Sequence, residues 1–213
     1  TRAPGMTMRR VPFFSMSALV MGLGLVVVMP VLLGTLTYLF VDHRNGREAF
    51  GGNTGLYDWA GWIFSPGAAA LFALPVAGLL ADGAPLLFKQ RTPARGIVFA
   101  GFGLMGVAAL GSVTQDAVHS VPWNGSDLFI GGSEDVRQKL YDVVPWAMFN
   151  LLPLLGLTVV LLMSLFLAKP VKGARPNVTP ALAFGFLGLS MVMVGMIGTA
   201  LLAIDDLGLQ GTA

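Results

Sequence analysis

Long apolar stretches separated by polar connections divide the chain into five segments, at residues 11–41, 59–81, 96–113, 143–168 and 179–204. Each is close to the length of about 20 residues that a helix needs to cross a bilayer core about 30 Å thick. Backbone groups cannot remain unpaired in lipid, so spanning segments of this kind are helical. The pattern predicts an all-α membrane protein, a single bundle over residues 1–213 with about five transmembrane helices.

The second segment contains an uncharged run from Trp62 to Gly78, with three consecutive alanines and two prolines. Proline is costly in a water-exposed helix, but a membrane helix tolerates it when neighbouring groups satisfy the freed carbonyls. Glycine also recurs within the apolar segments, and small residues let membrane helices approach closely. We therefore expect a kinked helix within a tightly packed bundle, or glycine-rich faces that pack against a partner subunit.

The composition supports the membrane class. Of 213 residues, 55% are hydrophobic and 11% are charged, whereas globular chains have about 25% charged residues. Cysteine is absent, which excludes disulfides, thiolate metal sites and a cysteine nucleophile. The net charge of +2 does not indicate nucleic-acid binding, because the basic residues lie in connections between apolar segments. Residues 1–5 lack the pattern of a signal peptide, so we expect a processed start or a piece of a longer chain.

The charges of the connections predict the orientation. Five spanning segments would place nine basic residues on one side and four on the other. The nine are Arg2, Arg9, Arg10, Lys89, Arg91, Arg95, Lys169, Lys172 and Arg175. Basic connections favour the cytoplasmic side, and every acidic residue except Asp82 falls on the opposite side. We expect the N-terminus inside and the C-terminus outside a prokaryotic cell (inner) membrane.

The longest connection, residues 114–142, is expected outside and is rich in acidic side chains. Ser133 followed by Glu134 and Asp135 has the composition of a helix start, with a capping hydroxyl and acids in the first turn. An acidic outer loop is suited to docking a basic partner such as a cytochrome. A solvated cap with no partner is the alternative interpretation.

Candidate chemistry is scarce. The predicted spans contain essentially no ionisable residue, although such residues are the usual sign of function within a membrane. His43 and His119 fall in outer connections without a second ligand at a helical spacing. Three methionines, Met191, Met193 and Met196, allow either a soft copper(I) site or ordinary apolar packing. The sequence predicts no catalytic, cofactor-binding or metal-ligating residue in this chain.

An ordered set of residues runs through nearly the whole chain. It comprises Arg2–Met8 with Pro12-Phe13-Phe14, Pro30, Asp42–Gly46, Trp62, Phe64, Leu74-Pro75, Gly78, Thr179-Pro180, Leu182, Gly195 and Gly198. This order resembles the region from the fifth to the ninth helix of subunit I of the haem–copper terminal oxidases (cytochrome c oxidases). The resemblance implies a degenerate paralogue or a middle fragment of that subunit.

The positions at which the family carries its chemistry are replaced. By the resemblance, the copper-binding histidine of the family falls on Pro66, its glutamate on Ala68 and its copper-site tyrosine on Ala70. The family's paired histidines fall near Thr114–Ala117, and the lysine of its proton path falls near Leu157. Alanine and leucine cannot ligate a metal or carry protons. The resemblance therefore implies that the copper centre cannot form in this chain, whereas the family's haem ligands lie in helices outside this segment.

These observations favour a non-catalytic structural or interaction subunit of a respiratory oxidase assembly, an oxidoreductase complex. We expect no cofactor in this chain, haem and copper in partner subunits, and membrane subunits and lipid as partners, without nucleic acid. One alternative is a part of a catalytic subunit I whose haem ligands lie outside this segment. A second is a small membrane transporter or an oxidase assembly factor, although the spans offer few polar side chains to line a path.

Overall fold

The computed structural model describes residues 10–46, 66–87, 89, 94–112, 147–166 and 179–202, and every element in these residues is helical. Helix α1 is Phe13–Asn45, α3 is Pro66–Leu87 and α7 is Pro180–Leu202. Helix α4, Arg95–Gly106, continues into the 3₁₀ turn η3, Val107–Ser112. Helix α6, Leu152–Leu161, lies between two π-helical turns, η5 at Ala147–Leu151 and η6 at Leu162–Phe166. The expected outer loop, residues 114–142, lies outside the described residues.

Four of the described helices are long and apolar enough to cross a membrane, which confirms the all-α membrane class. They are Phe13–Asn45, Ala68–Leu87, Ala147–Ser164 and Pro180–Gly198. The third predicted segment is a shorter apolar helix, Arg95–Leu110. Helix α4 rises about 18 Å at 1.5 Å per residue, and η3 adds about 12 Å at its larger 3₁₀ rise. Together they reach about 30 Å, the thickness of the hydrocarbon core.

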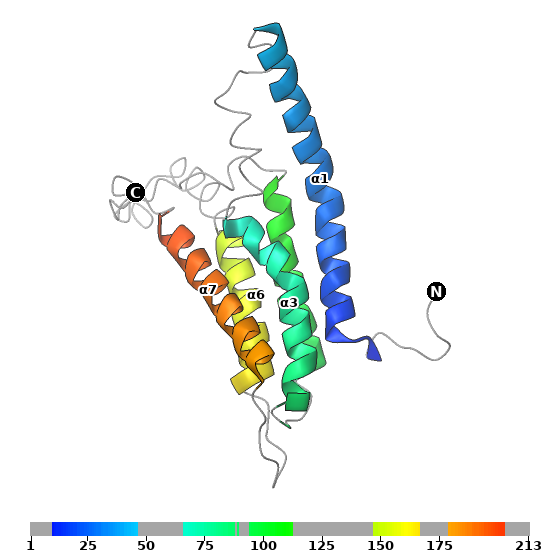
Figure 1. The fold of residues 1–213 in the computed structure, drawn as a ribbon, viewed down its shortest axis with the longest axis vertical. Helices are drawn as coiled ribbons and strands as arrows, with labels where there is room; N and C mark the ends of the chain where they lie inside the picture. Colours follow the sequence, from blue (N-terminus) through cyan, green and yellow to red (C-terminus); the bar gives the residue numbers. More distant parts are fainter. Residues whose placement is uncertain are drawn as a thin grey trace, which may run out of the picture.

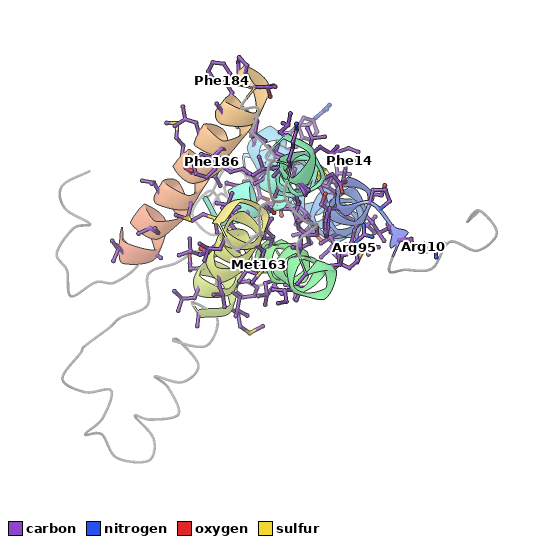
Figure 2. The ribbon with its side chains drawn as sticks, turned by 90° about the horizontal axis from the view of Figure 1, so that it is seen from below. Arg10, Phe14, Arg95, Met163, Phe184 and Phe186 are labelled. Atoms are coloured by element: carbon purple, nitrogen blue, oxygen red, sulfur yellow. The ribbon has the colours of Figure 1, made fainter. Side chains whose placement is uncertain are left out.

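Consecutive helices run in alternating directions, so that one end of the bundle collects the start of α1, the end of α3 and the start of α4 (Figure 1). We call this the Phe13 end. Helix α3 contacts α1, α4, α6 and α7, and α1 and α7 lie on opposite sides of the bundle (Figure 2). Helix α1 extends well beyond its neighbours at the other end (Figure 1). Arg10 precedes α1 and Lys89 follows α3, so both basic residues belong to the Phe13 end.

Small side chains let α3 occupy its central place. Six of its alanines have 6% or less of their surface exposed: Ala68, Ala70, Ala73, Ala77, Ala81 and Ala84. Leu71 and Leu74 are fully buried between them, and Pro75 and Pro85 lie inside the helix. The alanine-rich run therefore forms the contact surface of a helix with neighbours on several sides.

Glycines mark the closest helix crossings. A Cβ on Gly156 of α6 would lie 2.5 Å from the carbonyl oxygen of Gly101 of α4, and one on Gly101 would lie 3.0 Å from the oxygen of Gly156. A Cβ on Gly78 of α3 would meet the Cα of Phe14 of α1 at 2.9 Å. Other glycines face open space: Gly22, Gly34, Gly103, Gly185, Gly188, Gly195 and Gly198. The expected close packing thus uses only some of the glycines.

Candidate functional site

Helix α1 begins without a cap from its own sequence. Pro12 occupies the N-cap position and makes no side-chain hydrogen bond to the helix, although the first amides of a helix have no partner within it. Asp82 of α3 accepts these bonds instead. The amide of Phe13 donates to Oδ1 at 3.0 Å, and that of Phe14 donates to Oδ2 at 2.8 Å. A carboxylate at this position also opposes the positive end of the helix dipole.

Arg95, the first residue of α4, holds the same segment from another side. Its Nη2 donates to the carbonyl oxygen of Val11 at 3.0 Å, and its guanidinium carbon lies 5.0 Å from the centroid of the Phe13 ring. That ring is 1% exposed and meets the ring of Phe99 edge-on at 5.6 Å. Arg95 therefore makes both a hydrogen bond and a cation–π contact. Figure 2 shows Arg95 and Phe14 at the Phe13 end of α1.

We call Asp82, Arg95 and the segment Val11–Phe14 the α1 junction. The sequence-based expectation that the spans contain essentially no ionisable residue requires correction at this point. Asp82 lies inside α3, which continues to Leu87 rather than ending at Ala81, and Arg95 belongs to α4 rather than to a connection. The carboxylate can lie at this helix end because two backbone amides of α1 donate to its oxygens, and the guanidinium donates from Nη2 to a backbone carbonyl just before α1. The junction joins three helices, and both charges are engaged in structure.

The positions that the resemblance assigns to metal and proton chemistry carry no such chemistry in the described residues. Pro66 is the first residue of α3, and Ala68, Ala70 and Leu157 are fully buried in the apolar core. The described part of the chain contains no group of three or more His, Asp or Glu residues arranged to hold a metal ion. His43 lies exposed in the last turn of α1 rather than in the connection expected from the sequence. Residues 114–117 and 119 lie outside the described residues.

The three methionines of α7 do not share one surface. Met191 is 69% exposed, whereas Met196 is 3% exposed and belongs to the core. The sulfur of Met193 lies 3.7 Å from Oγ1 of Thr158 on α6, a hydroxyl that also lies 2.8 Å from the carbonyl oxygen of Leu154 as its nearer acceptor. Met191 thus lies on the outer face while Met193 and Met196 pack inward, an arrangement typical of apolar filling.

A groove of about 370 Å³ lies between the second half of α3 and the start of α7. Its lining residues are Val76, Leu79, Leu80, Asp82, Gly83, Leu86 and Leu87 on one side, and Thr179, Ala181, Leu182 and Gly185 on the other. All of these residues except Asp82 and Thr179 are apolar. We call this cavity the α3–α7 groove. It offers a shape for hydrocarbon and no pair of groups suited to acid–base catalysis.

Comparison with known proteins identifies partial relatives. The chain is 31% identical over 116 residues to cytochrome c oxidase subunit 1 of Cereibacter sphaeroides, which covers 53% of this chain and 20% of that protein. It is 34% identical over 124 residues to the probable cytochrome c oxidase subunit 1-alpha of Streptomyces coelicolor, covering 55% of this chain and 20% of the relative. It is 30% identical over 112 residues to the probable cytochrome c oxidase subunit 1-beta of Nocardia farcinica, covering 51% of this chain and 19% of the relative.

These matches confirm the resemblance to oxidase subunit I over about half of the chain. No family model matches the chain, and no solved structure matches it. The aligned regions cover about a fifth of the length of the curated relatives.

Proposed function

From this similarity, we propose that the chain is a subunit I-like, non-catalytic membrane subunit of a bacterial cytochrome c oxidase assembly. The observation that carries the proposal is the combination of relatedness to subunit I with apolar residues at the positions of its copper chemistry. Ala68 and Ala70 are fully buried, so a metal ligand supplied from elsewhere would have to displace core packing. The chain then contributes a scaffold, and haem and copper belong to partner subunits.

The outer faces of α1 and α7 support an interaction role. Both spanning windows are 17% buried within the chain, and their exposed side chains include Leu23, Val26, Phe184 and Met191. Such faces pack against lipid or against helices of other subunits. We place the Phe13 end, with Arg10, Lys89 and Arg95, at the cytoplasmic side, because basic residues favour that side. The acidic connection 114–142 would then face outward, where a basic cytochrome could dock.

Affinity purification of the tagged chain from its native membrane in mild detergent tests the proposal. We expect it to recover haem- and copper-binding oxidase subunits, identified by mass spectrometry, together with a visible haem spectrum. A tagged membrane protein of unrelated function serves as the control. Recovery of the chain without any oxidase subunit or haem absorption would contradict the proposed role.

A second candidate function is a part of a catalytic subunit I whose haem ligands lie outside these 213 residues. This candidate is favoured because the aligned regions amount to only about a fifth of the length of each relative. The intact mass of the protein in the purified complex distinguishes the two functions. A mass near 22.4 kDa supports a separate subunit, and a polypeptide several times larger supports the catalytic alternative.

A further inference from the structure

The α3–α7 groove is about as long as one leaflet of a bilayer is thick. Along α3 it extends from Val76 to Leu87, a rise of about 17 Å at 1.5 Å per residue. Half of a hydrocarbon core about 30 Å thick is about 15 Å. A partner helix that crosses the membrane would contact α3 and α7 over the full thickness, whereas this groove ends near the middle. Its length therefore matches a lipid acyl chain better than a second transmembrane helix.

A basic residue follows the last groove residue of α3 along the chain, at the Phe13 end of the bundle. Leu87 lines the groove, and Lys89, two residues later, is exposed on a turn at the Phe13 end. A lysine near a helix end at the membrane surface extends its ammonium toward the interface. A phosphate held there would leave its acyl chain directed along Leu86, Leu79 and Val76.

The negative charge of Asp82 does not oppose this arrangement strongly. Its two oxygens accept the amides of Phe13 and Phe14, so the carboxylate is engaged with the positive end of α1. By sequence it lies five residues before Leu87, about 7 Å deeper along the helix axis. The wall that faces the acyl chain is thus mainly aliphatic.

We propose that the α3–α7 groove binds one acyl chain of a phospholipid from the leaflet at the Phe13 end, with the lipid phosphate on Lys89. The bound lipid would fill the space between α3 and α7 and keep α7 in contact with the bundle on this side. The inference rests on the groove and on the membrane-spanning helices, and it is independent of the proposed role in an oxidase assembly.

Photolabelling of the full chain in lipid nanodiscs tests the proposal. The probes are phosphatidylglycerol with a diazirine in one acyl chain and a diacylglycerol with the same chains but no phosphate, and mass spectrometry maps the adducts. We expect adducts of the phosphatidylglycerol probe to concentrate on the groove residues of α3 and α7, with much weaker labelling by the diacylglycerol. Lys89→Asn should remove the difference between the probes, because asparagine tolerates the positive φ of 50° at this position but carries no charge.

Glycine substitutions provide matched variants. A Cβ at Gly83, Gly185 or Gly188 meets nothing within 4 Å, yet only Gly83 and Gly185 line the groove. Gly185→Leu and Gly83→Leu should reduce groove labelling roughly tenfold, equivalent to about 1.4 kcal/mol of binding free energy. Gly188→Leu, one turn further along α7, should leave labelling unchanged.

Three results would overturn the proposal. The first is even labelling around all helices, as expected for lipid that only surrounds the protein. The second is equal labelling by the two probes in the unmodified chain. The third is retained groove labelling in both Gly185→Leu and Gly83→Leu. Competition by unlabelled phosphatidylglycerol on the unmodified chain provides a readout that requires no variant: it should abolish the groove adducts, and its failure to do so would contradict a specific site.

Discussion

Asp82 supplies the helix cap that Pro12 cannot provide. Asp82 lies 69 residues after Phe13, whose amide donates to it. The bond therefore connects the end of α3 to the start of α1. Two hydrogen bonds from backbone amides to a charged acceptor of this kind contribute more than neutral bonds. At the residue scale, the stability of the bundle should therefore be sensitive to this single side chain.

Replacing Asp82 tests this dependence. Asp82→Ala removes both acceptors and should lower the free energy of unfolding by about 2–4 kcal/mol. Asp82→Asn retains one acceptor and should cost about half as much. Unfolding in detergent micelles, followed by circular dichroism during titration with a denaturing detergent, measures the difference.

Ser190→Ala is the matched control, because the Ser190 hydroxyl donates only within its own helix, to the carbonyl oxygen of Phe186 at 2.9 Å. It should change stability by less than about 0.5 kcal/mol. Equal stability of Asp82→Ala and Ser190→Ala would show that the carboxylate does not hold α1.

At the scale of elements, Asp82 and Arg95 act on the same short segment from α3 and α4. Once one of these side chains is replaced, the start of α1 is already less firmly held. Replacing the other should then lower the free energy of unfolding by less than it does in the unmodified chain. We expect Asp82→Ala and Arg95→Ala together to cost less than the sum of the single effects, by about 1 kcal/mol. A double-mutant cycle in the same unfolding assay measures this coupling, and strictly additive effects would contradict a shared junction.

The crossing of α4 and α6 makes a second prediction at this scale. Gly156→Ala places a methyl group 2.5 Å from the oxygen of Gly101, so the helices must separate, at a cost of about 1–3 kcal/mol. Gly103→Ala on α4 meets nothing within 4 Å and should stabilise the helix by about 0.5–1 kcal/mol. Thermal unfolding of the two variants should therefore shift in opposite directions, and a shift in the same direction would contradict this close helix crossing.

Within the described residues, helix α1, the π-flanked α6 and helix α7 overlap the predicted segments 11–41, 143–168 and 179–204, because long uncharged runs have few alternatives in lipid. Helix α3 continues past Ala81 because Asp82 is satisfied by α1, a partner that local sequence does not reveal.

The α1 junction could not be predicted for the same reason. Its hydrogen bonds join residues 68, 69 and 84 positions apart. The one local signal was the start of α1 after Pro12 without a capping Ser, Thr, Asp or Asn, which indicates that a cap must come from elsewhere. The α3–α7 groove likewise depends on how two distant helices pack.

At the scale of the whole molecule, the orientation that we propose rests on the end of the bundle at which basic residues gather. The chain has no cysteine, so single cysteines can report the sidedness. Lys89→Cys should react with a membrane-impermeant maleimide only when the cytoplasmic face is accessible, as in inverted vesicles. Asn45→Cys, at the opposite end of α1, should react in intact spheroplasts. The reverse pattern would contradict an N-terminus inside.

The central claim is that a scaffold related to oxidase subunit I persists in this chain without its copper ligands. The most direct test is the copper content of the chain, purified alone in detergent and measured by inductively coupled plasma mass spectrometry after incubation with copper(I) and removal of excess metal. We predict far less than one copper per chain, with Met191→Leu giving the same value. Copper bound at one equivalent per chain would contradict the account.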